Sequence, residues 1–302
     1  QGNPGPTLEE GAARAGVSTA TVSRCLNRPD GVSQDTRDRV MATVRELGYA
    51  PNFGARALAA KRTNTFGAII PTMENAIFAR GIQAFQEELG RHGYTLLVAS
   101  SSYEEALEEE QIRTLAARGA DGLLLIGYHR DPSLHDFLKS RSVPTLLAWA
   151  CDYNSDLPAI GFSNKNAMAD LARLVLEKGH RKIGVISADT GANDRARDRV
   201  AGVQLAAREA GLDVDRIPVI ETTYSIESGV EAFRQIMGWT PRPTAVFCGN
   251  DVLAIGALKA AKEMGLRVPE DVSVTGFDDI EIASLAEPAL TTVHVPHREM
   301  GR

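Results

Sequence analysis

Residues 16–27 read GVSTATVSRCLN, and this stretch decides how the N-terminal part of the chain folds. Small hydroxylated side chains surround one arginine, as in an exposed loop, but apolar residues are spaced among them. On a helix from Ser18 to Leu26, Val22 and Leu26 share the inward face, because residues four apart lie one turn apart. The stretch therefore predicts a turn followed by a short amphipathic helix.

The flanking residues predict two more helices. Residues 8–15 are rich in alanine and have acidic residues in the first turn, with Thr7 as a candidate cap. Gly16 permits the positive φ of a tight turn, and a third helix runs from Ser33 until Gly48 ends it. Three short helices with a glycine turn between the first two predict a helix-turn-helix domain over residues 7–51.

The charge distribution supports a contact with nucleic acid. The chain has a net charge of −6, but its first 62 residues carry nine Lys or Arg against six Asp or Glu. That segment has a net charge of +3, and the remainder of the chain has −9. A basic segment joined to an acidic body favours a polyanionic partner for the basic segment alone.

The predicted second helix presents short polar side chains outward. Hydroxyl groups and a helix N-terminus suit phosphate oxygens, and Arg24 is able to reach a guanine edge with two hydrogen bonds. The alternative is a small capped helical bundle with a polar surface and no partner. The candidate DNA-binding residues here are Ser18, Thr19, Ala20, Thr21, Ser23, Arg24 and Asn27.

From residue 66 onward, short apolar runs alternate with longer segments of helical spacing. The runs cover residues 66–70, 95–99, 122–126, 145–148, 182–186, 217–220, 244–248 and 272–276, and each except the fourth precedes a helix-like segment. This alternation predicts doubly wound parallel sheets with helices on both faces. The runs form two sets, so we expect two α/β subdomains, residues 63–161 and 162–289.

Polar and aromatic residues follow the predicted strands. In open parallel sheets, ligands bind beyond the carboxyl ends of the strands. The residues there are rich in hydroxyls, carboxylates, amides and aromatic rings, which fits a small polar ligand held between rings. They include Phe78, Tyr128, Trp149, Tyr224, Asn250 and Asp278.

The chain resembles the LacI/GalR (lactose-repressor) family of bacterial transcriptional regulators. The resemblance is carried by AGVSTATVSRCLN, by VSQDTRDRVMATVRELGYAPNFGARAL and by TNTFGAIIP, and with the body it covers residues 7–300. It implies a helix-turn-helix head and an α/β body of two periplasmic-binding-protein-type subdomains. It also implies that residues 290–302 begin a crossover back to the N-terminal subdomain. The family pattern continues past residue 302, so we expect this chain to be part of a longer protein.

The resemblance also implies a hinge helix and linker over residues 52–62, ordered on operator binding. Asn52, Ala55 and Arg56 would contact DNA there, and Leu58 would enter the minor groove at the centre of a pseudo-palindrome. Without the family, this segment is a marginal helix that is able to fold on binding. A leucine is chemically suited to unstack a base step.

For the effector, the resemblance carries over both hydrogen-bonding and ring positions. Asn250, Asp278 and Arg199 fall where the family hydrogen-bonds its ligand, and Phe78, Phe162 and Tyr224 fall where side chains line the cleft. Trp149 departs from the best-known members, which can have a carboxylate there, so a stacking face would replace an acceptor.

Each of these residues also has a structural interpretation. Asp278 would cap the next helix and Asn250 would shape its turn. Arg199 would belong to a surface salt-bridge cluster, and Phe162 and Tyr224 would be plain core.

The remaining features narrow the class of protein. The chain shows no membrane span or secretory signal, which favours a cytoplasmic protein, and its three distant cysteines are expected to be free thiols. Since no nucleotide-binding glycine loop or GxSxG motif follows a strand, we expect neither an enzyme nor a cofactor, and no metal site.

The leading hypothesis is a repressor of a catabolic operon, controlled by a sugar or sugar acid. It would bind double-stranded operator DNA as a homodimer, with a tetramer left open. A solute-binding protein and a sugar-phosphate or nucleoside enzyme remain as alternatives.

Overall fold

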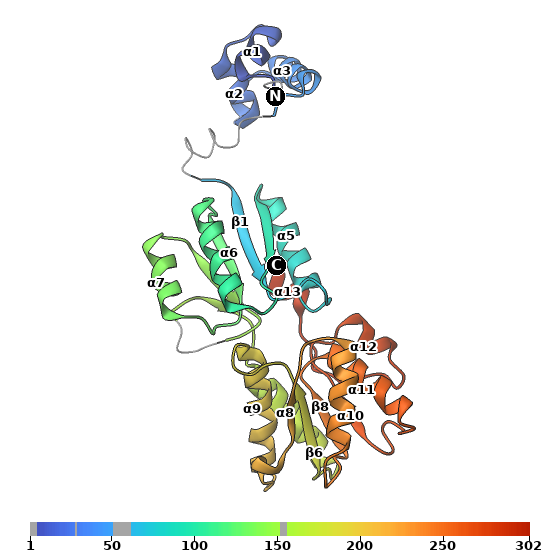
Figure 1. Ribbon diagram of the computed structural model, residues 1–302. Coiled ribbons are helices and arrows are strands. Elements are labelled where there is room, and N and C mark those ends of the chain that lie inside the picture. The colour runs from blue at the N-terminus through green and yellow to red at the C-terminus, as the bar shows by residue number, and fades with distance from the viewer. Residues whose placement is uncertain (1–4, 28, 51–61, 152–155) are drawn as a thin grey trace. The chain divides into compact units, whose positions relative to one another are not determined.

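The computed structural model describes residues 5–27, 29–50, 62–151 and 156–302 (Figure 1). The chain divides into two compact units, residues 1–63 and 64–302. We call residues 5–50 the head and residues 64–302 the body. The predicted hinge positions Asn52, Ala55, Arg56 and Leu58 lie outside the described residues. Within the described part of the chain, no helix is long and apolar enough to cross a membrane.

The head consists of three helices and a short 3-10 turn. The helices are α1 (Leu8–Ala15), α2 (Thr19–Asn27) and α3 (Gln34–Leu47), and the turn is η1 (Pro29–Gly31). Thr7 and Glu10 form a reciprocal capping box at the start of α1. Gly16, at φ 66°, and Gly48, at φ 63°, end α1 and α3 in the left-handed conformation that glycine adopts without strain. The predicted helix-turn-helix order is confirmed.

A small apolar core holds the three helices of the head together. Val22 and Val40 are fully buried, and Ala12, Cys25 and Val44 pack around them. Leu26 is only partly buried, because Cys25, three residues after Val22, also lies on the inward side of α2. Sequence reasoning placed Leu26 inward and overlooked Cys25.

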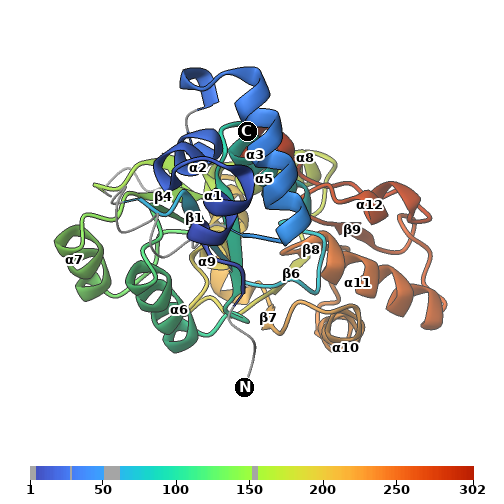
Figure 2. The ribbon, with the colours of Figure 1, turned by 90° about the horizontal axis from the view of Figure 1, so that it is seen from above.

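The first sheet of the body is parallel, in the order β2-β1-β3-β4-β5. Apolar residues of the strands face α6 and α7 on one side, and on the other side they face the region of α5 and α13. Figure 2 shows α6 and α7 together on one side of the body. The elements are β1 (Thr65–Ile70), α5 (Ala79–Arg91), β2 (Thr95–Ser100), α6 (Glu105–Ala117), β3 (Gly122–Ile126), α7 (Pro132–Ser140), β4 (Thr145–Ala148), β5 (Ala159–Ile160) and α13 (His297–Gly301).

The second sheet is also parallel, in the order β7-β6-β8-β9. Helices α8 and α9 pack together on one face, and α10 and α11 pack together on the other. The elements are α8 (Asn164–Glu177), β6 (Ile183–Ser187), α9 (Asp194–Glu209), η2 (Val214–Arg216), β7 (Val219–Glu221), α10 (Ile226–Met237), β8 (Ala245–Cys248), α11 (Asp251–Glu263), β9 (Ser273–Thr275) and α12 (Glu281–Leu285). The predicted class, a helical head with two doubly wound parallel sheets, is confirmed.

Two elements of the body differ from the sequence prediction. Strand β5 was not predicted, because a two-residue exposed edge strand after Pro158 has no apolar run to reveal it. Helix α12 has five residues instead of the longer helix expected after the last strand. Pro288 follows shortly after its end, and proline disfavours helical conformation in the residue before it.

The two sheets are joined where the chain crosses between them. Between β5 and α8, Phe162 stacks on Phe277 with ring centroids 6.0 Å apart. After β9 the chain returns to the first sheet, where α13 packs against α5. Gly81 and Gly301 permit that approach, because a Cβ atom on Gly301 would collide with the Gly81 carbonyl oxygen. Residues that follow strands of both sheets line the same cavities.

Candidate DNA-binding and effector sites

Helix α2 presents most of the predicted DNA-binding residues to solvent. Ser18, Thr19, Ala20, Arg24 and Asn27 are exposed, whereas Thr21 and Ser23 are half-buried.

Several of these side chains have local hydrogen bonds. Ser18 Oγ accepts from the Thr21 amide at 3.1 Å, so Ser18 caps the helix. Asn27 Nδ2 donates to the Ser23 carbonyl at 2.8 Å, and Arg24 Nε lies 3.4 Å from the Ala20 carbonyl. The terminal nitrogens of Arg24 remain available for a ligand, and basic Arg24 has no acidic partner among the described residues.

In the body, the three residues predicted to hydrogen-bond the effector come together in one buried cluster. Asp278 follows β9 and is 1% exposed, Asn250 begins α11 and is 0% exposed, and Arg199 lies on α9 at 6% exposure. Together with Phe78, Trp149 and Tyr224 they line a small cavity of about 10 Å³. We call this cavity the inner chamber.

Arg199 is fixed at the inner chamber by four partners. Its Nε donates to Asn164 Oδ1 at 2.9 Å and its Nη1 donates to the Gly249 carbonyl at 2.7 Å. The guanidinium carbon lies 3.8 Å from the centroid of the Phe277 ring, an arrangement that stabilises a cation. Nη2 lies 3.6 Å from Asp278 Oδ1, which is an ion-pair distance. Arg199 therefore belongs to the buried chamber and not to a surface salt-bridge cluster.

Asp278 and Asn250 have hydrogen-bonding capacity that the protein does not use. Among the described residues, both carboxylate oxygens of Asp278, and Nδ2 of Asn250, find no hydrogen-bond partner, and all three atoms are buried. Asn250 Oδ1 meanwhile accepts from the Leu253 amide at 2.9 Å, so Asn250 also caps α11. Burial raises the pKa of Asp278 to about 7, against the opposing effect of Arg199. Unpaired buried polar atoms are rare and costly, so the chamber holds two polar side chains with unused hydrogen-bonding capacity.

The predicted aromatic residues differ in how they surround the chamber. Trp149 is 2% exposed, and its Nε1 donates to His297 Nδ1 at 3.0 Å. Its ring meets Phe78 edge-on at 5.4 Å, and a Cβ on Gly81 would collide with it. The indole is thus enclosed by protein over much of its surface. Phe162 is partly buried and stacks on Phe277, the same ring that the Arg199 guanidinium contacts.

Tyr128 takes part in a contact between the two sheets that we call the clasp, formed by Tyr128, His129, Asp194, Arg195 and Asp198. The Tyr128 hydroxyl donates to Asp198 at 3.0 Å, and the amides of Tyr128 and His129 donate to Asp194. Arg195 pairs with Asp194 at 2.8 Å. Burial, together with Asp198, raises the pKa of Tyr128 to about 12.

Sequence reasoning missed the carboxylates of the clasp. Asp194 and Asp198 lie one turn apart on α9, and their charges alone suggested surface residues. Gly127, at φ 78°, was a usable signal, because a Cβ there would collide with Arg195 and Asp194. Both the left-handed φ and the close approach of these α9 side chains favour glycine at that position.

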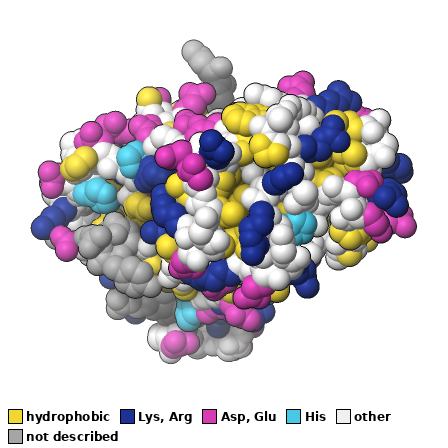
Figure 3. Space-filling model, turned by 90° about the horizontal axis from the view of Figure 1, so that it is seen from below, with side chains coloured by type: hydrophobic (Ala, Val, Ile, Leu, Met, Phe, Trp, Pro, Cys, Tyr) yellow, Lys and Arg dark blue, Asp and Glu magenta, His cyan; other side chains and the backbone are white. Residues whose placement is uncertain are grey.

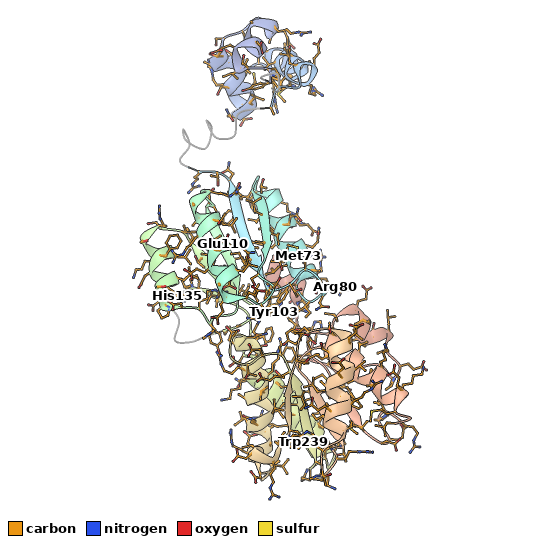
Figure 4. All side chains as sticks on the ribbon, viewed as in Figure 1. Met73, Arg80, Tyr103, Glu110, His135 and Trp239 are labelled. Carbon is orange, nitrogen blue, oxygen red and sulfur yellow. The ribbon has the colours of Figure 1, made fainter. Side chains whose placement is uncertain are left out.

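A second, larger cavity lies beside the inner chamber, and we call it the outer pocket. It has a volume of about 520 Å³ and is lined by residues that follow β2, β3, β6 and β7. Tyr103, Asn193, Arg195 and Tyr224 line both cavities. Tyr103, labelled in Figure 4, was not among the predicted site residues. Its ring meets Tyr224 across the two subdomains, with centroids 5.6 Å apart.

Known families match both parts of the chain. Residues 7–52 match the bacterial regulatory proteins of the lacI family, and residues 172–302 match the periplasmic binding protein-like domain. The HTH-type transcriptional repressor PurR of Salmonella newport is 37% identical over 297 residues, covering 98% of this chain and 87% of that protein. The chain belongs to the LacI family. It is a DNA-binding transcriptional repressor of that family and not an enzyme.

Solved structures of transcriptional regulators have the same fold. The lac repressor dimer bound to operator and the anti-inducer ONPF has a TM-score of 0.86 at 29% identity, covering 98% of this chain and 89% of that one. A complex of the transcriptional regulator CelR with cellobiose has a TM-score of 0.69 at 31% identity. The match covers 98% of this chain and 90% of the CelR chain.

Proposed function

We propose that this LacI-family repressor binds a pseudo-palindromic operator through α2 and is controlled by a carbohydrate-like effector in the inner chamber. The observation that carries the proposal is the pair of unpartnered Asp278 oxygens beside the Arg199 guanidinium. The genes it controls would serve the catabolism of that effector, and the protein would act in the cytoplasm, where operator DNA is found.

The chemistry of the inner chamber supports a polyhydroxyl ligand. Asp278 accepts two hydrogen bonds, and Asn250 Nδ2 and Arg199 Nη2 donate. A vicinal diol offers two donors to a carboxylate and keeps its lone pairs for the two nitrogen donors. Sugars supply that pattern, and the CelR structure holds cellobiose. Because the chamber has a volume of only about 10 Å³, the ligand would bind with a rearrangement of its walls.

Such a rearrangement provides the coupling to DNA. An effector that contacts both subdomains stabilises one arrangement of the two sheets over the other, and this difference in affinity is the coupling free energy.

We further propose a homodimer, whose two heads would read two half-sites. The lac repressor structure is a dimer, and α12 exposes apolar side chains here, with Leu285 at 77% and Ile282 at 38%. Exposed apolar residues of this kind mark contact surfaces. On the face seen from below in Figure 3, basic and acidic side chains lie among the apolar ones.

The operator function is tested by gel-shift titration at several salt concentrations. Sequence-specific binding is expected, with an affinity that falls steeply as salt rises. Arg24→Ala is expected to weaken specific binding by about 1–3 kcal/mol and to relax the preference at one base pair. The control is Arg45→Ala on α3, whose Nε donates within its own helix at 3.2 Å. Binding without sequence preference in the unmodified protein would contradict the proposal.

The effector function is tested by a thermal-shift screen of sugars, sugar acids and nucleobases against the full chain. A ligand at one hundred times its Kd stabilises the folded state by about 2.7 kcal/mol, which raises the Tm measurably. Asp278→Asn is expected to abolish the shift, and the control Asp279→Asn to preserve it, because Asp279 is exposed and bonded to His294 at 2.7 Å. A nucleobase as the only hit would overturn the carbohydrate assignment.

A further inference from the structure

His297 occupies a buried position between the two subdomains. It begins α13, where the chain has returned to the first sheet and packs against α5. The residue is 6% exposed, and both of its ring nitrogens have partners. Trp149 Nε1 lies 3.0 Å from Nδ1, and the carbonyl oxygen of Asp278 lies 3.0 Å from Nε2. His297 therefore joins a residue of the first subdomain to a residue of the second.

The chemistry of these two partners fixes the state of the imidazole. An indole nitrogen only donates a hydrogen bond, and a carbonyl oxygen only accepts one. Nδ1 must therefore lack a proton and Nε2 must have one, so the ring is neutral. A second proton, on Nδ1, would point at the indole N–H and break that hydrogen bond. The two bonds are compatible with only one tautomer of the neutral ring.

The two bonds of His297 close a ring of polar contacts at the inner chamber. Asn164 Nδ2 donates to the Trp149 carbonyl at 3.0 Å, and Asn164 Oδ1 accepts from Arg199. Arg199 lies at ion-pair distance from Asp278, whose backbone carbonyl accepts from His297. All five residues are buried. The ring crosses between the subdomains twice, and His297 makes one of these crossings.

The two residues that His297 joins have strained backbones. Trp149 has φ 59° and Asp278 has φ 103°, in the left-handed region that residues other than glycine rarely adopt. Such conformations are costly and persist only where the surrounding contacts fix them. His297 bonds to the side chain of Trp149 and to the backbone of Asp278. It is therefore placed to fix two walls of the chamber at once.

We propose that His297 is a positioning residue for the inner chamber, whose neutral ring holds Trp149 and Asp278 in the orientations that a ligand meets. Because His297 takes the indole N–H, Trp149 contributes ring carbons to the chamber and no donor. Polar groups of a ligand would then be met by Asp278, Asn250 and Arg199. This consequence rests on the proposed effector function, whereas the positioning role itself needs no ligand.

The groups around His297 favour its neutral form. Burial lowers the pKa of His297, and the bond to the Asp278 carbonyl opposes that effect. The charges of His294, Arg199 and Arg80 lower the pKa further. Protonation of the ring is therefore expected below the ordinary histidine pKa of about 6.5. The indole is expected to lose its acceptor as the pH falls through that range.

The test follows the Trp149 indole N–H by NMR in the ligand-free full chain, labelled with 15N-tryptophan. Every sample carries Trp239→Phe, which removes the only other tryptophan, a residue 47% exposed (Figure 4). At pH 8 the Trp149 N–H is expected to exchange with water about fivefold more slowly than in His297→Phe, the factor that one net hydrogen bond supplies. Its resonance is expected to shift as the pH is lowered to 5, with a midpoint below about 6.5.

Variants assign the transition to one side chain. His297→Gln keeps an acceptor and a donor but does not titrate, so it is expected to restore slow exchange and to lose the transition. The controls remove two neighbouring groups that titrate, exposed His294 and the Asp278 carboxyl, whose pKa burial raises to about 7. His294→Gln and Asp278→Asn are both expected to keep the transition, because the Asp278 carbonyl remains in both.

Two results would overturn the proposal. One is an indole N–H that exchanges equally fast in the parent and in His297→Phe. The other is a pH transition that survives in His297→Gln, and this result decides the question even if His297→Phe does not fold.

The outcome is separable from that of the proposed function. All of these measurements use ligand-free protein, so their failure would leave the sugar screen and its Asp278→Asn variant to decide the effector function. A transition that belongs to His297, together with a screen that finds no ligand, would support the positioning role and contradict the effector function.

Discussion

Two carboxylates that follow strands of the second sheet, Asp194 and Asp278, are equally buried, but the groups that surround them differ. Each residue is 1% exposed. Asp194 accepts from two backbone amides and pairs with Arg195. Within the described part of the chain, Asp278 has no hydrogen-bond partner on either oxygen, and its ion-pair partner Arg199 is 3.6 Å away. Burial alone therefore does not tell whether a carboxylate has its hydrogen bonds satisfied.

The pKa shifts follow the same contrast. Burial opposes the ionised form of Asp194, but Arg195 and the amides of His129 and Tyr128 outweigh it and lower its pKa. For Asp278 burial prevails and raises the pKa to about 7. A satisfied buried charge stabilises the fold, whereas an unsatisfied one is held at a cost that a ligand can offset.

The largest expected effect is on the satisfied carboxylate. Asp194→Ala leaves the Arg195 charge buried and two loop amides without an acceptor, and it is expected to destabilise the body by about 3–5 kcal/mol. Chemical denaturation of the full chain measures this. The exposed Asp136→Ala is the control and is expected to stay within about 0.5 kcal/mol. A loss below about 1 kcal/mol in Asp194→Ala would remove the distinction between the two sites.

The pH dependence of stability should have opposite signs at the two sites. The pKa of Asp278 is higher in the folded protein than in the unfolded chain. The contribution of Asp278 to the free energy of unfolding is therefore fully present below the ordinary aspartate pKa of about 4 and is lost as the pH rises toward 7. Asp278→Asn is therefore expected to be more stable than the parent protein at pH 7.5, by about 2–4 kcal/mol, and not at pH 4.

Asp194 contributes in the other direction. Its lowered pKa gives stability above pH 4 that is lost as the pH falls, so the penalty of Asp194→Ala should shrink in acid. Denaturation midpoints measured at pH 4 to 8 test both trends. Parallel pH profiles for the two variants would show that the carboxylates do not differ as the structure indicates.

A third buried carboxylate, Asp251, is intermediate between the other two. It accepts from Thr292 Oγ1 at 2.6 Å and from the Ile280 amide at 2.8 Å, yet burial raises its pKa to about 6. Thr292→Val removes the hydroxyl, raises that pKa further and is expected to cost about 2 kcal/mol at pH 8. The exposed Thr291→Val is the matched control. A cost that is equally large at pH 4 would point to packing instead of charge.

The smallest expected effect is at the edge of the clasp. Tyr128→Phe removes a hydroxyl that donates to half-buried Asp198, and it is expected to cost about 0.5–1.5 kcal/mol. Tyr94 is in an aromatic contact with Phe66, and Tyr94→Phe provides a control for the loss of a tyrosine hydroxyl. No difference between the two variants would show that the Tyr128 bond contributes little to holding the sheets together.

Sequence reasoning located the inner chamber but not its surroundings. Asn250 and Asp278 were placed together because both follow parallel strands, a rule that depends only on the order of strands along the chain. Tyr103 was missed as a site residue, because its importance comes from a partner, Tyr224, on the other subdomain. Trp149 was expected to offer a stacking face, and nothing in the sequence showed that His297, 148 residues later, bonds to its indole.

The sequence by itself determined the three helices of the head, the two parallel sheets and the strand ends where polar side chains gather. These follow from the spacing of apolar residues and from capping, which act over a few residues. Only the tertiary structure decided which carboxylate has hydrogen-bond partners among the described residues and which has none. That depends on single donors brought within about 3 Å from residues 65 or more positions away, and such contacts leave no periodic pattern in the chain.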